Sequence, residues 1–211
     1  MGSVVVEVSP SLDGYVAGSG VSLERPFGDA GDRLHHWLGF GGSAPTPADR
    51  AAAERLFATT GAIVIGRRMF DVGIGPWGED GAFGMPVFVV TSRPADELVK
   101  GPTTFTFVTE GVLRAVELAR AAAGDRDVVV NGGADVIQQA VAAGLVDEVR
   151  LHVVPVLLGG GTRLFERPLD DRVELERTDA VTTPLATHLT FRIGRPLPEP
   201  ASPGAQVSTA R

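Results

Sequence analysis

The chain contains no cysteine, and this absence excludes a disulfide framework, a thiolate metal site and a cysteine nucleophile. It also fits a reducing compartment, so we expect a cytoplasmic protein. Long apolar runs are missing as well. No stretch approaches the roughly 20 residues of a membrane span, and the start "MGSVVVEVSP" lacks the basic and apolar blocks of a signal peptide. We therefore expect a soluble protein without a membrane partner.

Positive charge is scarce: 19 Lys and Arg face 26 Asp and Glu, which gives a formal net charge of −7. An acidic chain disfavours a surface for nucleic acid or anionic lipid. A local basic pocket for one phosphorylated cofactor is still compatible with this charge. The partner that we expect is a small molecule.

The 211 residues, 44% of them hydrophobic, suffice for a globular domain with its own core. We expect residues 1–195 to form a single domain. Residues 196–211, rich in proline and small polar residues, have the composition of a disordered tail.

Short apolar runs alternate with helical patterns, which is typical of an α/β domain with a mostly parallel sheet. The helical patterns lie at 46–61, 109–124 and 134–144, each ended by a glycine. Strand-like segments in the last third, "VELERTD" and "ATHLTFRIG", predict antiparallel strands at one edge. The strand patterns are "VVVEV", "AIVIG", "PVFVV", "TFTFV", "DVVV" and "EVRLHVVPVLLG".

Ligands of open parallel sheets bind beyond the carboxyl ends of the strands. Four unusual segments directly follow predicted strands: "SPSLDGYVAG", "GRRMFDVG", "TSRP" and "NGGAD". We therefore predict that they meet on one rim of the sheet. The long glycine-rich segment 17–46, with a short helical piece near 32–38, is expected to be a functional loop beside this rim.

Gly132 and Gly133 remove side chains where a strand gives way to a helix. Backbone amides at this helix start can approach a pyrophosphate. The alternative is a tight turn without a ligand, because the full G-x-G-x-x-G pattern is absent.

Two further clusters supply cations and hydroxyl donors at neighbouring strand ends: Arg67 with Arg68, and Thr91, Ser92 and Arg93. Arginine suits a phosphate dianion, although any one of these residues is as readily a solvated surface arginine. Neither cluster contains an acidic residue to hold a free ribose 2'-hydroxyl. NADPH is therefore the expected cofactor, rather than NADH.

Asp49 and His152 are the candidate catalytic residues. Asp49 lies in the first turn of a helix, on the face of Ala53, Leu56 and Phe57, where a raised pKa would allow proton transfer. Its alternative role is to satisfy the helix dipole. His152 orients a carboxylate or a water in one interpretation, and is an ordinary half-buried histidine in the other.

A flat substrate ring needs apolar and aromatic walls. The candidates for substrate binding are Asp13, Tyr15, Trp37, Phe57 and Trp77, each of which can equally serve packing. We expect no metal, since His35 and His36 are adjacent and no partner completes a zinc pair.

Taken in order, "SPSLDGYVAG", "GAIVIGRRMFDVG", "PVFVVTSRP" and "VVVNGGADVIQQAVAAGLVDEVRLHVVPVLLGGGTRLFE" resemble the dihydrofolate reductase-like superfamily. The closest resemblance is to the reductase domain of the bacterial riboflavin-biosynthesis deaminase-reductase and its stand-alone relatives. It runs from about residue 3 to 193. The cytidine-deaminase zinc motif of the bifunctional enzyme is absent, so we expect no deaminase activity.

The resemblance implies NADPH laid across the strand ends of a mostly parallel sheet. It implies a proton-donating role for Asp49, with His152 beside it. It also implies a homodimer. The residues that match cofactor-binding positions of the family are Val16 and Ala17 beside the nicotinamide, Leu158 and Gly159 across from them, Gly66, Arg67, Arg68, Thr91, Ser92 and Arg93 around the adenosine phosphate, and Gly132, Gly133, Ala134 and Asp135 at the pyrophosphate.

The leading hypothesis is an NADPH-dependent reductase that delivers hydride to a C=N or C=O carbon of a small polar substrate. A pterin, a pyrimidine-like ring and a ribosylamino ketose are the candidate substrates. One alternative is a non-catalytic nucleotide-binding module of the same fold. The other is a specialised-metabolism reductase of an imine or enone, with residues 17–46 as its lid.

Overall fold

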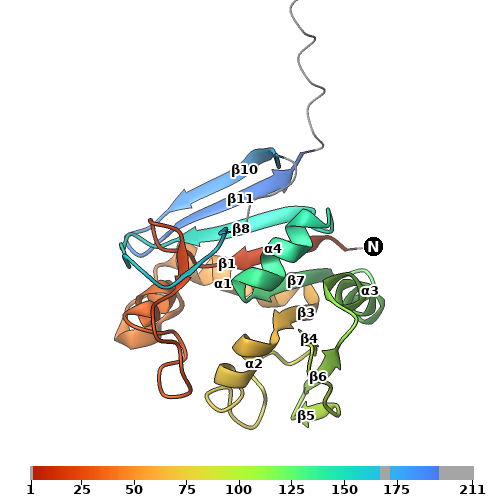
Figure 1. Ribbon diagram of the computed structural model, residues 1–211. Coiled ribbons are helices and arrows are strands. Elements are labelled where there is room, and N and C mark those ends of the chain that lie inside the picture. The colour runs from red at the N-terminus through yellow and green to blue at the C-terminus, as the bar shows by residue number, and fades with distance from the viewer. Residues whose placement is uncertain (1, 167–171, 195–211) are drawn as a thin grey trace, which may run out of the picture.

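The computed structural model describes residues 2–166 and 172–194. A large sheet with the strand order β10-β11-β8-β1-β7-β3-β4-β6-β5 forms its centre (Figure 1). The six strands from β8 to β6 are parallel, and antiparallel strands flank them on both sides. The predicted α/β class with an antiparallel C-terminal edge is confirmed. The predicted tail, 196–211, lies outside the described residues.

The strands of the large sheet are β1 (Val4–Val8), β3 (Thr60–Gly66), β4 (Pro86–Val90), β5 (Leu98–Lys100), β6 (Thr103–Val108), β7 (Asp127–Gly132), β8 (Glu148–Val153), β10 (Leu175–Thr182) and β11 (Thr187–Ile193). Strands β2 (Tyr15–Ala17) and β9 (Thr162–Arg163) pair separately. The helices are α1 (Pro47–Thr59), α2 (Arg67–Gly73), α3 (Val112–Ala123) and α4 (Ala134–Ala142), with the 3₁₀ turns η1 (Gly31–Leu38) and η2 (Phe40–Gly42).

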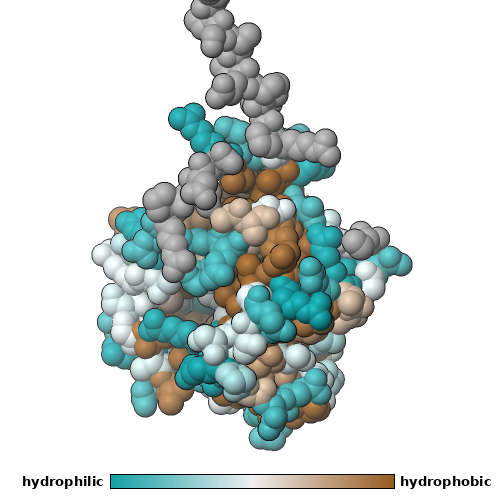
Figure 2. Space-filling view, turned by 45° about the vertical axis from the view of Figure 1, so that its right-hand side comes forward, coloured by the Kyte–Doolittle hydropathy of each residue, from teal (hydrophilic) through white to brown (hydrophobic). Residues whose placement is uncertain are grey.

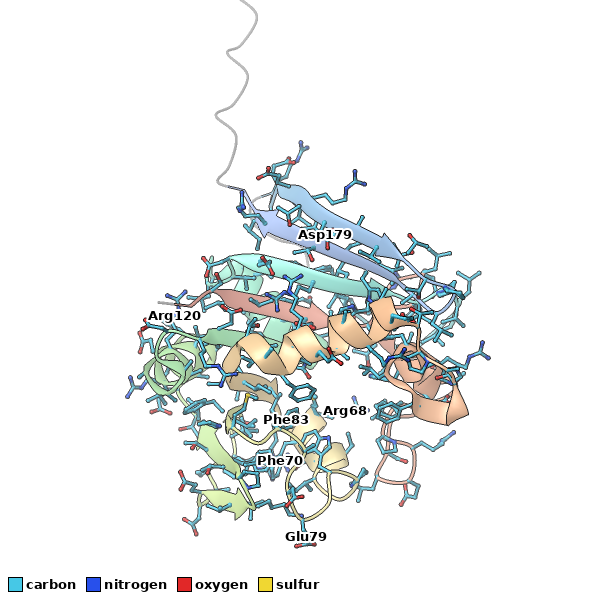
Figure 3. All side chains as sticks on the ribbon, turned by 180° about the vertical axis from the view of Figure 1, so that it is seen from behind. Arg68, Phe70, Glu79, Phe83, Arg120 and Asp179 are labelled. Atoms are coloured by element: carbon cyan, nitrogen blue, oxygen red, sulfur yellow. The ribbon has the colours of Figure 1, made fainter. Side chains whose placement is uncertain are left out.

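The central strands are apolar on both faces because helices cover both sides. Helices α3 and α4 pack on β3, β4 and β7, and α1 crosses the opposite face (Figures 1 and 3). Helix α1 begins where the sequence predicts. Thr46 forms a capping box with Asp49, and Pro47 occupies the first helical position. No helix in residues 2–166 and 172–194 has the length and apolar character needed to cross a membrane.

The β8–β11–β10 side of the sheet has polar residues toward α1 and apolar ones on its other face. The apolar set is Leu151, Leu175, Leu189, Phe191 and Ile193, which we call the apolar face. Every residue of β10 is exposed. Figure 2 shows hydrophobic side chains gathered in the upper part of the molecule. Leu151, Phe191 and Ile193 are partly buried against the core, whereas Leu175 is 45% exposed.

The segment 17–46 folds back on itself before α1. Gly18 N–H donates to Phe27 O, and Asp29 N–H donates to Ser19 O, so the segment closes as a compact loop. It continues into η1, which matches the helical piece predicted near 32–38. Arg68 of α2 donates to Val21 O at 3.4 Å, so this loop reaches the rim of the sheet.

Candidate functional site at the carboxyl rim of the sheet

The four unusual segments lie at one edge of the sheet. Strands β1, β7, β3 and β4 are parallel neighbours, so their carboxyl ends meet. At the centre, a methyl group added to Gly66 would lie 3.5 Å from Gly133 N and 3.1 Å from Val136 Cγ2. Gly132 has a φ of 150°, a value that favours glycine. Two strand ends therefore approach each other where only small residues fit.

Helix α4 starts at this point without a side-chain cap. Its N-cap is Gly133, and a methyl group added there would meet no atom within 4 Å. The backbone N–H groups of this first turn therefore have no side-chain cap. Asp135 adds a negative charge to the same turn, and its carboxylate accepts a hydrogen bond from Gln139.

Asp71 joins the two predicted phosphate-binding arginines. Its Oδ1 accepts from Arg67 Nε and its Oδ2 from Arg93 Nη2, both at 2.7 Å. Burial alone would raise the pKa of Asp71, but the bonds from Arg67 and Arg93 outweigh it and lower the pKa. The expectation that no acidic residue stands here is wrong. The helical turn of α2 brings Asp71, four residues after Arg67, back to the arginine.

The other residues of these two clusters have separate roles. The Arg67 guanidinium lies 5.4 Å from the Phe107 ring centre and 5.7 Å from that of Phe70. Thr91 Oγ1 accepts the Arg93 N–H at 3.0 Å and so holds the turn after β4. Ser92 is exposed. Of this group, Arg67 and Arg93 are the residues that converge.

The loops after β1 and β8 are tied together by Asp13. Its carboxylate accepts from Gly159 N at 2.8 Å, Leu158 N at 3.1 Å and Ser11 Oγ at 2.6 Å. The Ser11 bond is the main cause that lowers the pKa of Asp13 to about 2. Asp13, predicted to bind substrate, uses these oxygens to fix the loop that was predicted to contact nicotinamide.

Val16 and Ala17 lie in β2 and are held by β9. Arg163 of β9 places its guanidinium 4.6 Å from the ring centre of Tyr15. The two segments predicted to enclose the nicotinamide are thus parts of one small substructure at the rim.

Asp49 is completely buried and accepts four hydrogen bonds. Thr46 N and Thr46 Oγ1 donate to Oδ2, each at 2.7 Å, and Thr183 Oγ1 and His188 Nε2 donate to Oδ1 at 2.8 and 2.9 Å. Burial raises its pKa, but these bonds together outweigh burial and lower it. The expected raised pKa is wrong, and Asp49 instead forms part of the capping box at the start of α1. Phe57, assigned to the same face, is half exposed.

His152 is buried and faces residues that sequence reasoning missed. Its Nδ1 lies 2.8 Å from His188 Nδ1, and its Nε2 lies 3.3 Å from Glu7 Oε1. Burial lowers the pKa of His152, partly offset by Glu7. The sequence contained a signal that could have identified Glu7. It is the one acidic residue in the apolar run "VVVEV", and a buried carboxylate in a central strand needs a charged or hydrogen-bonding partner.

A cavity of about 230 Å³ opens above these groups, between α1 and the β10–β11 hairpin. Glu7, His152 and His188 line it together with Arg55 and Asp179. Figure 3 shows α1 across this face of the sheet, with Asp179 above it on the hairpin.

The predicted aromatic wall does not form. Trp37 is buried against His152, with ring centres 4.1 Å apart, and donates to Ser9. Trp77 packs instead on Phe83 and Phe105 in a second core beside α2, the region of Phe70 and Phe83 in Figure 3. Trp37 is therefore the one tryptophan near the buried histidines, and Trp77 is a core residue elsewhere.

Comparisons with known proteins agree with this architecture. Solved structures with similar folds include a putative riboflavin biosynthesis protein from Shewanella sp. PV-4, with 23% identity, a TM-score of 0.68, and coverage of 92% of this chain and 99% of that one. A pyrimidine reductase-like protein from Corynebacterium diphtheriae has 15% identity, a TM-score of 0.58, and coverage of 92% of both chains. A dihydrofolate reductase from Enterococcus faecalis, complexed with NADP(H) and RAB-propyl, has 17% identity, a TM-score of 0.55, and coverage of 92% and 97%.

At such identities these likenesses show the fold. A search among curated proteins found no match. The sequence profile described as the RibD C-terminal domain matches residues 3–189, nearly the whole described chain. The chain therefore belongs to the RibD C-terminal domain family.

Proposed function

We propose that the protein is an NADPH-dependent reductase that transfers hydride to a C=N or C=O carbon of a small polar substrate. Family membership and the similar fold of a dihydrofolate reductase complexed with NADP(H) support this assignment. The observation that carries it is the convergence of Arg67 and Arg93 at the rim, next to the uncapped start of α4.

The residues at the rim fit a dinucleotide phosphate. Gly133 leaves open space for close backbone approach, while Gly66 and Gly132 allow the strand ends to pack against Val136 and Met69. The first turn of α4 offers N–H donors without a side-chain cap. Arg67 and Arg93 would hold the 2'-phosphate through the donors that Asp71 does not use. The loop that Asp13 fixes and strand β2 would enclose the nicotinamide. When bound, this cofactor supplies the hydride, and the chain supplies alignment and a proton.

A pterin, a pyrimidine-like ring or a ribosylamino ketose is the proposed substrate class. Each is small and polar and carries a C=N or C=O group. The cavity lined by Glu7, His152 and His188 offers the carboxylate and imidazole groups that such molecules can hydrogen-bond.

Separate titrations of NADPH and NADH test the cofactor assignment, with nicotinamide fluorescence and thermal shift as readouts. We expect tighter binding of NADPH. Arg93→Ala should weaken NADPH binding about 10-fold, because it removes one charge-assisted bond, and should leave NADH binding nearly unchanged. Absence of binding by either nucleotide would overturn the proposal.

Asp71→Asn is the matched variant for this experiment. It keeps the shape of the side chain but removes a negative charge beside the expected phosphate. We expect the NADPH to NADH affinity ratio to rise about threefold, the size of a screened surface interaction. A fall in this ratio would mean that Asp71 is needed to position the arginines.

A non-catalytic nucleotide-binding module is the second candidate function. It is favoured by the state of Asp49, whose oxygens are occupied by four hydrogen bonds and shielded from solvent. Such a protein would bind NADPH but oxidise it with no member of a pterin, pyrimidine, imine and enone panel.

We further propose that the protein is a cytoplasmic homodimer. The partner is a second copy that covers the apolar face of β8, β11 and β10. Glu176, Arg177 and Asp179 on β10 oppose pairing through the outer edge of this strand, so contact through the face is favoured.

A further inference from the structure

Four ionisable side chains form an unbroken hydrogen-bonded chain beneath α1. Asp49 Oδ1 lies 2.9 Å from His188 Nε2, His188 Nδ1 lies 2.8 Å from His152 Nδ1, and His152 Nε2 lies 3.3 Å from Glu7 Oε1. None of these side chains is more than 9% exposed. These four groups are therefore largely shielded from bulk water, and the two imidazoles make their hydrogen bonds within the chain.

The contacts need more hydrogens than two neutral imidazoles provide. Each of the three contacts joins two atoms that are acceptors when unprotonated, so each requires one hydrogen. Two neutral histidines carry two N–H groups between them. The chain must therefore hold one additional proton, or one contact would set two lone pairs against each other in a buried site.

The surroundings locate this proton on His188. Asp49 also accepts from Thr46 and Thr183, and Glu7 Oε2 also accepts from Arg150 Nη1 at 3.2 Å, so both carboxylates are stabilised as anions. Burial disfavours a charge on His152, as its lowered pKa shows. His188 has the shorter contact to a carboxylate, and only as a cation can it donate to both Asp49 and His152.

We propose that His188 is an imidazolium at neutral pH, and that His188 and His152 are the proton source for reduction in the adjacent cavity. His188 donates Nε2–H to Asp49 and Nδ1–H to His152, which donates Nε2–H to Glu7. This inference rests on the proposed reductase function, in which hydride reaches the substrate carbon and a proton must reach the nitrogen or oxygen.

The proton transfer balances within the chain. The hydrogen bond from His152 Nε2–H to Glu7 breaks as this proton passes to the substrate heteroatom in the cavity, and His188 Nδ1 passes its proton to His152 Nδ1. Both histidines are then neutral, and one solvated proton taken up from bulk solvent restores the starting state. Asp49 stabilises the positive charge of His188 and is thus a positioning residue. Its own oxygens already accept four hydrogen bonds, so it acts through His188.

Charged groups on the neighbouring elements determine the electrostatic field around His152 and His188. Arg55 of α1 and Asp179 of β10 line the cavity. Arg150 of β8 contacts Glu7, Glu148 and Asp127, with the last at 3.6 Å. On the remaining side, Trp37 covers both rings, with centres 4.1 and 5.1 Å away.

Nitrogen-15 NMR of the four histidines at pH 7 tests the proposal on the intact protein. We expect His188 to show two protonated ring nitrogens and His152 to be the neutral Nε2–H tautomer. A neutral His188 at pH 7 would overturn the proposal. This spectrum needs neither cofactor nor substrate, so its outcome is separate from that of the NADPH titration.

Asp49→Asn removes the anion that retains the proton, and we expect His188 to become neutral at pH 7. Glu148→Gln is the matched control, because it removes a charge next to Arg150 without touching either imidazole, and the imidazolium should persist. A loss of the signal in both variants would contradict the role of Asp49. Should Asp49→Asn fail to fold, the spectrum of the unaltered protein still decides.

Activity provides a second readout once a substrate from the panel is reduced. His152→Asn should lower kcat at least 100-fold and change KM little, because the donor is lost while the cavity is kept. An unchanged kcat would show that the proton comes from elsewhere.

Discussion

His35 shows how one buried side chain links stability to pH. Its ring lies 4.3 Å from the Phe27 ring within the loop before α1. Burial is the main cause that lowers its pKa from 6.5 to about 4. Between these values the unfolded chain binds a proton that the folded protein does not. Stability is therefore complete above pH 6.5 and falls as the pH drops toward 4.

We predict that His35→Phe reduces this acid-induced loss of stability. The shift corresponds to at most about 3 kcal/mol at pH 4 relative to pH 7. Urea unfolding at several pH values measures it, with His36→Gln as the neighbouring control. An equal loss in His35→Phe and the unaltered protein would refute the prediction. His152 contributes in the same direction, so part of the slope should persist.

The sequence predicts single residues well where local geometry decides them. Thr46 and Pro47 define the start of α1 through capping rules, and the structure agrees. Prediction from the sequence fails where the hydrogen-bond partners come from distant strands. The partners of Asp49 and His152 include His188 and Glu7, which lie far away in the chain, so no local pattern could assign the protonation states of these groups.

The position of a whole element, strand β2, also depends on residues that are distant in the chain. Gly161 has a φ of 127°, and a methyl group added to it would lie 2.1 Å from Ala17 O. We predict that Gly161→Ala lowers the free energy of unfolding by about 2 to 4 kcal/mol, through strain and displacement of β2. It should also weaken NADPH binding, since β2 encloses the proposed nicotinamide site.

Gly159→Ala is the control for this effect. Gly159 also has a positive φ, 69°, but an added methyl group meets nothing within 4 Å. Its expected cost is about 1 kcal/mol, which reflects backbone conformation alone. Urea unfolding and NADPH titration of both variants separate crowding from conformational strain; equal losses would refute the crowding argument.

Among the elements, α1, α3, α4 and the C-terminal edge strands β10 and β11 follow from sequence patterns, and they match the structure within a few residues, whereas the opposite edge strand, β5, was not predicted. Helix α2 was not predicted from the sequence because it is short and begins directly after β3. Its helical turn places Asp71 beside Arg67, which the linear sequence "GRRMFDVG" does not make evident. The prediction that no acidic residue lies beside these arginines was therefore wrong because helix α2 was not predicted.

At the scale of the whole molecule, the apolar face leads to a prediction about assembly. We expect a homodimer in analytical ultracentrifugation and a predominantly monomeric Leu175→Glu variant. Leu175 is 45% exposed and belongs to this face, and a symmetric interface repeats each substitution twice. The expected loss is about 2 to 4 kcal/mol of dimerisation free energy.

Leu113→Glu is the matched control, since Leu113 is 54% exposed on α3, on another part of the surface. It should leave the association unchanged. A monomeric unaltered protein, or equal dissociation in both variants, would contradict a dimer through the apolar face.

The position of β1 has a consequence for how the protein is made. Val4 pairs with Val128 and Val5 with Glu148, so β1 lies inside the finished sheet and leaves the ribosome well before both of its neighbours, β7 and β8. At typical rates of translation its partners emerge on the order of ten seconds later. During that interval a strand of four valines has no native neighbour on either side. Nascent chains of this protein should therefore be clients of the chaperones that shield apolar segments at the ribosome exit.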